Sequence, residues 1–217
     1  MNVEQARFNM IEQQIRPAGV LDTSILDLLG VVRREDFVPE AHRSLAFMDI
    51  EIPLPDGQAM LSPKIEARLV ESLDLNKQDN VLVVGAGTGY VTALIAHKAR
   101  RVVALESRPA LAAMAKLNLG RAGIGTAEVV QADGLLGYAP QAPYSAILLT
   151  GSVHEVPDAL LAQLMPGGRL LAVVGREPVM QAWLIRKSPE GHLSRQALFD
   201  TVTSPLDGVP VAEPFVL

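Results

Sequence analysis

Cysteine is absent from this 217-residue chain. A disulfide framework, a cysteine-ligated metal site and a thiol nucleophile are therefore all excluded. Long apolar runs are also missing, since the longest have the length of a strand and fall far short of the roughly 20 residues that span a bilayer. Residues 1–16 alternate charged and apolar positions and do not resemble the apolar stretch of a signal peptide. We therefore expect a cytoplasmic protein with no membrane partner.

An excess of positive charge is missing too. The 19 Lys and Arg residues are outnumbered by 24 Asp and Glu residues, which gives a formal net charge of −5. A mildly acidic chain is poorly suited to the phosphate backbone, so we expect no nucleic-acid partner. Hydrophobic residues make up 49% and charged residues 20%, which is typical of a globular chain. A chain of this length can bury one core as a single domain with a small N-terminal addition.

Helical periodicity dominates residues 1–50. Apolar residues recur there at steps of three and four in two segments. Pro17 and Gly19 separate the two segments and predict a break between two helices. Asp22 or Thr23 is placed to cap the second helix.

After residue 50 the hydrophobic pattern changes, and from residue 80 predicted strands alternate with predicted helices. Residues 50–57 contain three Pro or Gly residues and predict an extended loop, and a third helix is predicted over 63–73. From residue 80, short runs of consecutive apolar residues alternate with helical segments, which is typical of a parallel sheet covered on both faces. We predict strands over 81–84, 101–105, 127–130, 145–150 and 169–174, with helices over 89–99, 109–121 and 157–164.

The C-terminal part contains two further apolar clusters. Residues 183–185 and 197–199 predict antiparallel edge strands. Pro205, Pro210 and Pro214 predict an irregular end, because proline cannot donate a backbone hydrogen bond to a sheet.

Three glycines at alternate positions directly follow the first predicted strand. Glycine permits positive φ and lets a ligand approach the backbone, and open α/β sheets bind ligands at the carboxyl ends of their strands. Dinucleotide folds carry G-x-G-x-x-G, whereas the spacing here is G-x-G-x-G followed by Tyr90. This spacing suits a nucleoside without a pyrophosphate, such as S-adenosylmethionine, and NAD is disfavoured but stays an alternative. The predicted cofactor-binding turn consists of Gly85, Ala86, Gly87, Thr88 and Gly89.

Two acids follow the next two strands. Glu106 ends the second strand, where its carboxylate can accept hydrogen bonds from both ribose hydroxyls. Asp133 follows the third strand and can accept from the adenine amino group, with Gly134 leaving room for the ring. Taken singly, Asp133-Gly134 is most often a plain turn and Glu106 a helix-capping or solvated acid. Together with the glycine turn they predict an S-adenosylmethionine site.

At these residues the sequence resembles the protein-L-isoaspartate O-methyltransferase family over nearly the whole chain. The resemblance implies methyl transfer to the carboxylate of an isoaspartyl residue in damaged proteins. It also implies the α/β fold of class I S-adenosylmethionine-dependent methyltransferases, a Rossmann-like seven-stranded, mostly parallel sheet with an N-terminal helical addition. We expect a single domain, with a helical and acceptor-loop portion over 1–75 and the cofactor-binding core over 76–217. The resembling segments are the glycine turn, Met10–Gln13, Arg34–Pro39, Leu54–Gln58, Asp133-Gly134, Glu155–Pro157 and Leu164–Leu170.

The acceptor loop departs from the family pattern. In the family this loop reads Thr-Ile-Ser after Gly-Gln, and its Ser contacts the acceptor carboxylate. Alignment on the flanking residues puts Ala59 at the Thr position and Leu61 at the Ser position. Ser62 follows one residue later and is a candidate catalytic residue if the loop shifts by one. Alternatively, Ser62 caps the helix that begins at Pro63.

His154 is a second candidate catalytic residue. A phenol or amine acceptor would need a general base, and His154 follows a predicted strand end with Glu155 beside it to orient it. A surface-loop histidine is the alternative interpretation. Three functions therefore stay open: a protein-repair carboxyl methyltransferase, a methyltransferase of the same fold with another acceptor, such as a small molecule or another protein, and a cofactor-binding protein without catalysis. No metal site is expected.

Overall fold

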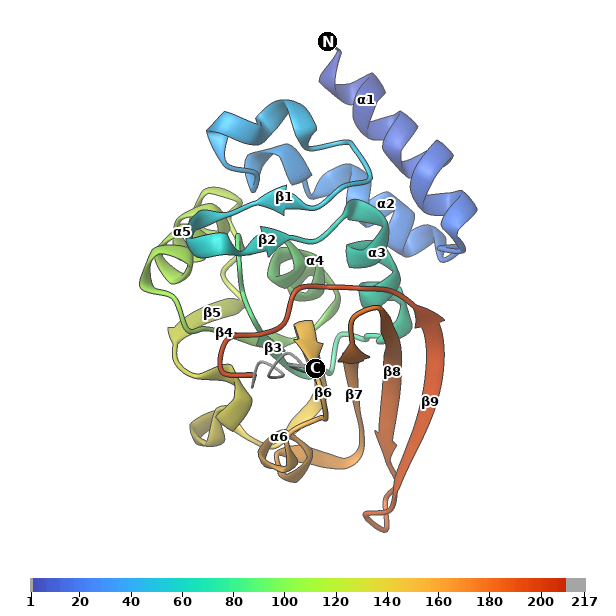
Figure 1. The fold of residues 1–217 in the computed structure, drawn as a ribbon, viewed down its shortest axis with the longest axis vertical. Coiled ribbons are helices and arrows are strands. Elements are labelled where there is room, and N and C mark those ends of the chain that lie inside the picture. Colours follow the sequence, from blue (N-terminus) through green and yellow to red (C-terminus); the bar gives the residue numbers. More distant parts are fainter. Residues whose placement is uncertain (1, 210–217) are drawn as a thin grey trace, which may run out of the picture.

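A single seven-stranded sheet organises the computed structural model, which describes residues 2–209 (Figure 1). Its strands lie in the order β5-β4-β3-β6-β7-β8-β9, and those from β5 to β7 are parallel while β8 runs antiparallel to both of its neighbours. The predicted Rossmann-like, mostly parallel seven-stranded sheet is thereby confirmed. The strands are β3 Asn80–Val84, β4 Arg101–Glu106, β5 Ala127–Gln131, β6 Tyr144–Val153, β7 Leu164–Arg176, β8 Val179–Lys187 and β9 Leu193–Asp200.

The central strands are apolar at consecutive positions because both faces of the sheet are covered. In β3, Val81 and Val83 belong to one core, while Leu82 and Val84 belong to another on the opposite face. The first core also contains apolar residues of the N-terminal helices and of α3 to α5, whereas the second contains Leu160 of α6. The helices are α1 Val3–Met10, α2 Thr23–Val31, α3 Pro63–Ser72, α4 Tyr90–Lys98, α5 Pro109–Arg121 and α6 Asp158–Ala162.

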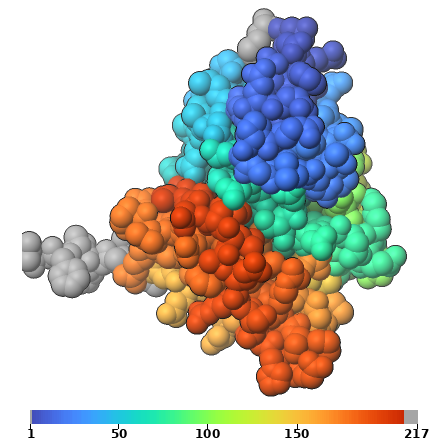
Figure 2. All heavy atoms as spheres, turned by 90° about the vertical axis from the view of Figure 1, so that its right-hand side faces the viewer, coloured from blue at the N-terminus to red at the C-terminus, as the bar shows by residue number. Residues whose placement is uncertain are grey.

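The N-terminal helices break where the sequence predicts. After α1 the chain continues through a π-helical turn and a 3₁₀ turn. This first helical segment ends at Gly19, which has φ of 97°. Asp22 caps α2, since its carboxylate accepts a hydrogen bond of 2.8 Å from the backbone N–H of Ser24. Figure 2 shows this part of the chain, in blue, gathered at one end of the molecule beyond the orange and red C-terminal strands.

The predicted extended loop over 50–57 contains more order than its prolines suggested. It forms the first half of a small antiparallel hairpin, β1 Ile52–Pro53 with β2 Ala59–Met60. Asp56 and Gly57 turn the chain with φ of 60° and 75°. Figure 1 places this hairpin across the carboxyl end of the sheet.

Several predicted boundaries differ from the structure in the C-terminal half, and the strand predicted over 169–174 is the longer β7 Leu164–Arg176. The helix predicted over 157–164 is confined to Asp158–Ala162, because Leu164 already pairs with Tyr144 as the first residue of β7. The strand predicted over 145–150 extends to Val153, because β7 continues beside it. The two predicted edge strands are longer and form β8 and β9. Of the prolines in the tail, Pro210 and Pro214 lie outside the described residues.

Within residues 2–209, no helix combines the length and the hydropathy needed to cross a bilayer.

A buried ion pair joins the amino end of the sheet to the end of α3. Arg169 of β7 donates a hydrogen bond of 2.8 Å to Asp79, and it also binds the backbone carbonyls of Leu73 and Asp74. Burial alone would raise the pKa of Asp79, but hydrogen bonds from Arg169, Asn76 and Ser145 outweigh burial and hold this pKa below its usual value. The pair therefore fixes the α3–β3 connection with both charges satisfied.

Replacement of Arg169 by methionine should destabilise the protein by about 3–5 kcal/mol, because the substitution leaves Asp79 buried without its counter-charge. Urea unfolding would measure this loss. Arg186→Met, at an exposed position of the neighbouring strand β8, is the matched control and should change stability by less than about 0.5 kcal/mol. Equal losses in the two variants would contradict the assignment.

Candidate functional site

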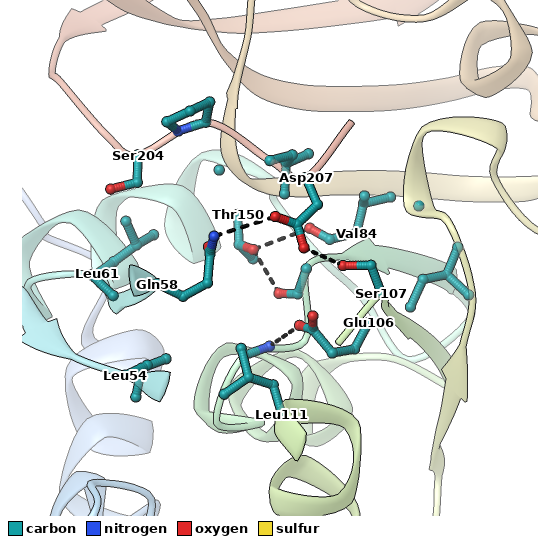
Figure 3. Close-up of a pocket in the computed structure, with 18 of the residues that line it drawn as sticks. Leu54, Gln58, Leu61, Val84, Glu106, Ser107, Leu111, Thr150, Ser204 and Asp207 are labelled. Atoms are coloured by element: carbon teal, nitrogen blue, oxygen red, sulfur yellow. Dashed lines mark hydrogen bonds between the residues drawn. The ribbon is translucent and has the colours of Figure 1, made fainter. Parts of the chain in front are cut away.

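A hollow of about 660 Å³ opens at the carboxyl end of the parallel strands (Figure 3). It is lined by the β1–β2 hairpin, the ends of β3, β4 and β6, the segment that follows β5, the start of α5 and a C-terminal segment. The lining residues that Figure 3 labels are Leu54, Gln58, Leu61, Val84, Glu106, Ser107, Leu111, Thr150, Ser204 and Asp207.

The glycine turn lies at the base of this hollow. Gly85, Gly87 and Gly89 have φ of 89°, 53° and 89°, in the left-handed region that favours glycine. The backbone N–H groups of Gly85 and Ala86 both donate to the carbonyl of Leu105 at 2.9 Å, which ties the turn to β4. A Cβ at Gly87 would meet no atom within 4 Å, so its missing side chain leaves open space beside the hollow.

The other glycines of the site are required by packing. A Cβ at Gly85 would lie 2.4 Å from Oγ1 of Thr150, and one at Gly134 would lie 2.3 Å from Cγ1 of Val84. At Gly89 a Cβ would lie 3.3 Å from the backbone of Ala115, so this residue sets the contact between α4 and α5. The third glycine of the turn therefore serves helix packing, although its spacing differs from that of dinucleotide folds.

Glu106 lies in the same hollow as the glycine turn. The carboxylate is buried, with 6% of the residue exposed. It accepts hydrogen bonds from the backbone N–H of Gly87 at 2.8 Å and from that of Arg108 at 3.1 Å. Each oxygen accepts one of these bonds and keeps lone-pair capacity for a ligand. The structure thus brings together the two features from which the sequence predicted a nucleoside site.

Asp133 is placed differently from its neighbour. Gly134 lines the hollow, whereas the carboxylate of Asp133 accepts a hydrogen bond of 3.0 Å from the N–H of Leu135 and caps a 3₁₀ turn. One oxygen of Asp133 is therefore already engaged. Recognition of an adenine amino group by this residue stays a prediction.

The two candidate catalytic residues lie away from this hollow. Ser62 occupies the N-cap position of α3, but its hydroxyl makes no capping hydrogen bond within the described part of the chain. Leu61, one residue earlier, lines the hollow instead. His154 lines a separate hollow that shares Leu135 with the first one. A role for either residue in catalysis stays a prediction.

A second hollow adjoins the first across the glycine turn. The two share Ala59, Leu61, Gly85, Gly87 and Thr150, and the second reaches Ala86 and Thr88 of the turn. It also reaches side chains that sequence reasoning did not single out, Glu66 of α3 and Tyr90 of α4. Of these two residues, only Glu66 could have been found from the sequence. It occupies a position on the buried face of α3, where the helical period otherwise places apolar residues.

A C-terminal segment closes one side of the first hollow. Pro205 bridges Ser152 at the end of β6, with backbone hydrogen bonds of 2.9 and 3.0 Å on either side of it. Asp207 then accepts two hydrogen bonds from the guanidinium of Arg108, at 2.7 and 2.8 Å, and one of 2.6 Å from the hydroxyl of Ser107. The Arg108 hydrogen bonds hold the pKa of Asp207 below its usual value.

The hairpin joins the same contact, which we call the clasp and define as Asp56, Gln58, Ser107, Arg108 and Asp207. Arg108 donates a hydrogen bond of 2.8 Å to the backbone carbonyl of Asp56. The side-chain amide of Gln58 donates a hydrogen bond of 3.4 Å to the carboxylate of Asp207. Figure 3 shows Asp207 between Gln58 and Ser107 at the edge of the hollow. The clasp could not be predicted from the sequence, because Arg108 and Asp207 are separated by 99 positions and no motif connects them.

Within residues 2–209 the structure contains no cluster of three side chains suited to hold a metal ion.

Comparison with known proteins identifies the family. The family model described as Protein-L-isoaspartate(D-aspartate) O-methyltransferase (PCMT) matches residues 5–208. The chain belongs to this family. Among curated members, the chain is 42% identical to the protein-L-isoaspartate O-methyltransferase of Methanoculleus marisnigri over 169 residues, which are 78% of this chain and 77% of that protein. It is 37% identical to that of Koribacter versatilis over 202 residues, which are 93% and 90% of the two chains.

Solved structures agree with the family assignment. A protein-L-isoaspartate O-methyltransferase structure superposes with a TM-score of 0.81 at 27% identity, covering 93% of this chain and 66% of the other, longer chain. A second structure, a Plasmodium falciparum protein solved in complex with S-adenosyl-L-homocysteine, shares the fold with a TM-score of 0.78 at 19% identity, covering 95% and 99%. The resemblance that the sequence suggested is thereby confirmed.

Members of the PCMT family use S-adenosylmethionine, and the residues of this hollow fit that cofactor. Gly87 leaves space for a ligand next to the backbone, and Glu106 presents acceptor capacity at the position expected for ribose hydroxyls. Gly85, Gly87, Glu106 and Gly134 would hold the nucleoside. When bound, the cofactor supplies an electrophilic methyl group on a sulfonium.

Substitution of Gly87 by valine should abolish cofactor binding, since its side chain would fill the open space at the turn. Gly123→Val is a matched control, because Gly123 also has positive φ (70°) and open space around its Cβ but lies in the loop after α5 and lines neither hollow. Calorimetric titration with S-adenosylhomocysteine would compare the two. Unchanged affinity in Gly87→Val would rule out the turn as the binding surface.

Substitution of Arg108 by methionine should release bound cofactor roughly fivefold faster, because a partly exposed ion pair contributes up to about 1 kcal/mol. A chase of labelled S-adenosylmethionine with unlabelled ligand measures the rate. Arg101→Met removes a longer and more exposed pair with Glu128, 3.6 Å apart at the other end of β4, and should leave the rate unchanged. If both variants behave alike, the clasp does not retain the ligand.

Proposed function

We propose that this chain transfers the methyl group of S-adenosylmethionine to the carboxylate of isoaspartyl residues in proteins or peptides. The observation that supports this most is the match to the PCMT family over residues 5–208, together with relatives that align over most of both chains. The relatives are named for this reaction. The hollow offers the nucleoside-binding groups that the reaction needs, with space next to the β1–β2 hairpin for an acceptor.

The residues of this chain act by alignment and by excluding water. A carboxylate acceptor is ionised near neutral pH and needs no general base, so the reaction is an in-line displacement at the methyl group. Leu54 and Leu61 of the hairpin region form an apolar wall of the hollow (Figure 3). Such a wall removes water from the acceptor oxygen and makes it a stronger nucleophile. The absence of a base is consistent with the position of His154 in a separate hollow.

A different acceptor is the second candidate, and Leu61 is the observation that favours it. Leu61 lines the hollow at the position where the family carries a serine that contacts the acceptor carboxylate. A leucine side chain offers no hydrogen bond there, so the wall is more apolar than the family pattern. An uncharged or differently shaped acceptor would suit this surface better. A cofactor-binding protein without catalysis is the third possibility that the sequence left open.

Labelled methyl transfer separates these functions. The purified protein is incubated with labelled S-adenosylmethionine and a peptide containing one isoaspartyl residue, beside the same peptide with a normal aspartyl residue. We expect label in the isoaspartyl peptide alone. No label in either peptide, with cofactor binding intact, would contradict the proposed acceptor and support the second or third candidate.

Replacement of Leu61 by serine should increase the turnover of the isoaspartyl peptide. The new hydroxyl would donate a hydrogen bond to the acceptor carboxylate, and a hydrogen bond to a charged group contributes about 1.5–3 kcal/mol, or roughly tenfold or more in kcat/KM. Ser62→Ala is the companion variant, because Ser62 lies at the N-cap and outside both hollows. We expect it to leave turnover unchanged, and a large loss would instead assign the acceptor contact to Ser62.

The cytoplasmic location and the absence of a nucleic-acid partner stay predictions, which cell fractionation and a nucleic-acid binding assay would test.

A further inference from the structure

The second hollow contains a buried acid that the proposed reaction does not use. Among the described residues that line this hollow, Glu66 is the only charged one. It is 1% exposed and comes from α3, which faces the glycine turn across the hollow. Charged side chains are rarely buried to this extent without a partner or a ligand, so the position of Glu66 requires an explanation.

Arg34 supplies only part of that explanation. Its Nε donates a hydrogen bond of 2.9 Å to Oε2 of Glu66, and its two terminal nitrogens donate to the carbonyls of Ala46 and Leu61 at 2.7 and 2.6 Å. Oε1 of Glu66 accepts no hydrogen bond from any residue among 2–209. Arg34 is fully buried, and none of its hydrogen bonds goes to this second oxygen. One carboxylate oxygen is therefore left for another donor.

The position of a bound nucleoside indicates which donor this is. Glu106 lies on the far side of the glycine turn from Glu66, in the first hollow, and the two hollows meet at Gly85 and Gly87. A ribose held by Glu106 directs the remainder of the cofactor across the turn and into the second hollow. That remainder is an amino acid whose α-ammonium is a cation with three donors.

We propose that Glu66 binds the α-ammonium group of the methionine part of S-adenosylmethionine through its free oxygen. This inference rests on the proposed function, because it concerns the cofactor of that reaction. The Arg34–Glu66 pair is neutral as a unit, so the second hollow gains a net attraction for the ammonium only through the close contact with the free oxygen. Arg34 holds Glu66 in place and at the same time fixes the backbone of the acceptor loop at Leu61.

Tyr90 provides a complementary group in the same hollow. Its hydroxyl is buried and has no hydrogen-bond partner among the described residues. A buried hydroxyl without a partner is costly, and a ligand that accepts from it removes this cost. The α-carboxylate of the methionine part is such an acceptor. One acid and one hydroxyl therefore match the two charges of the amino-acid end.

Burial raises the pKa of Glu66 to about 7, against the opposing effect of Arg34. The titratable and charged groups that face it are Arg34 and Tyr90, with the Arg7–Glu35 ion pair beyond them. Below pH 7 the carboxyl is protonated before the ligand binds, and it must lose that proton to pair with an ammonium. The affinity for the cofactor should therefore fall as the pH decreases below about 7.

The decisive experiment compares two ligands that differ only at the amino-acid end. S-adenosylhomocysteine carries the α-ammonium, whereas methylthioadenosine has the same nucleoside and sulfur without it. In Glu66→Gln the affinity for S-adenosylhomocysteine should decrease at pH 8 by roughly tenfold or more, the scale of a charged hydrogen bond. The affinity for methylthioadenosine should change by less than about twofold. Glutamine keeps an oxygen for Arg34, so the variant preserves that contact.

Glu35→Gln is the matched control. Glu35 is a buried acid of the same N-terminal part, paired with Arg7, and it lines neither hollow. We expect this variant to bind both ligands as the unaltered protein does. An equal loss of both ligands in Glu66→Gln, or no loss of either, would overturn the inference while leaving cofactor binding and the proposed function intact. Failure of the unaltered protein to bind either ligand would instead overturn both.

A pH series gives a second readout that a purely structural role of Glu66 would not produce. The unaltered protein should lose affinity for S-adenosylhomocysteine by up to tenfold per pH unit below about 7, and Glu66→Gln should lack this dependence. Methylthioadenosine affinity should be flat in both proteins over the same range. A pH dependence that persists in Glu66→Gln would contradict the assignment.

Discussion

The connection between Glu106 and the glycine turn is the contact on which the site depends. The turn contains three glycines with positive φ within five positions, Gly85, Gly87 and Gly89. Such a flexible turn keeps a fixed shape only if its backbone N–H groups are held by hydrogen bonds. Leu105 binds two of them through its carbonyl, and Glu106 binds a third through its carboxylate. Because both holders belong to the end of β4, the register of two parallel strands sets the geometry of the turn. A cofactor therefore meets a surface that is already organised.

A second constraint comes from the fully buried Arg34. It gathers Glu66, the carbonyl of Ala46 and the carbonyl of Leu61, and its guanidinium lies 5.7 Å from the ring centre of Tyr90. These contacts link the N-terminal addition, the acceptor loop and the start of α4. The N-terminal part is thus more than a cover for one face of the sheet, because it holds Leu61 at the wall of the first hollow. Leu61 presents an apolar side chain to the first hollow, while its backbone carbonyl is held by Arg34.

Much of the fold follows from local patterns in the sequence. Consecutive apolar residues at 81–84 and 101–105 predicted strands with two covered faces, and the two cores on either side of β3 show why. The turn and Glu106 could be placed together because parallel strands end at one edge of a sheet. Boundaries were less predictable where pairing overrides local preference, as at Leu164, which joins β7 although the periodicity around it is helical.

The remainder of the site depends on contacts between distant positions. Arg108 and Asp207 meet only because the chain returns alongside β6 after β9, and no local pattern carries that information. Glu66 is an intermediate case. An acid among the buried positions of a helix is visible in the sequence, but whether it is paired with an arginine, a ligand or water depends on tertiary packing. Ser62 likewise has the residue type of a helix cap, and its hydroxyl nevertheless makes no such bond.

The return of residues 204–207 to the hollow couples the pocket to one edge of the sheet. These residues follow β9 in the chain, and they line the hollow with Asp207 anchored on Ser107 and Arg108. Local opening of the β8–β9 edge would therefore also loosen one wall of the pocket, although the parallel strands that hold the glycine turn stay paired.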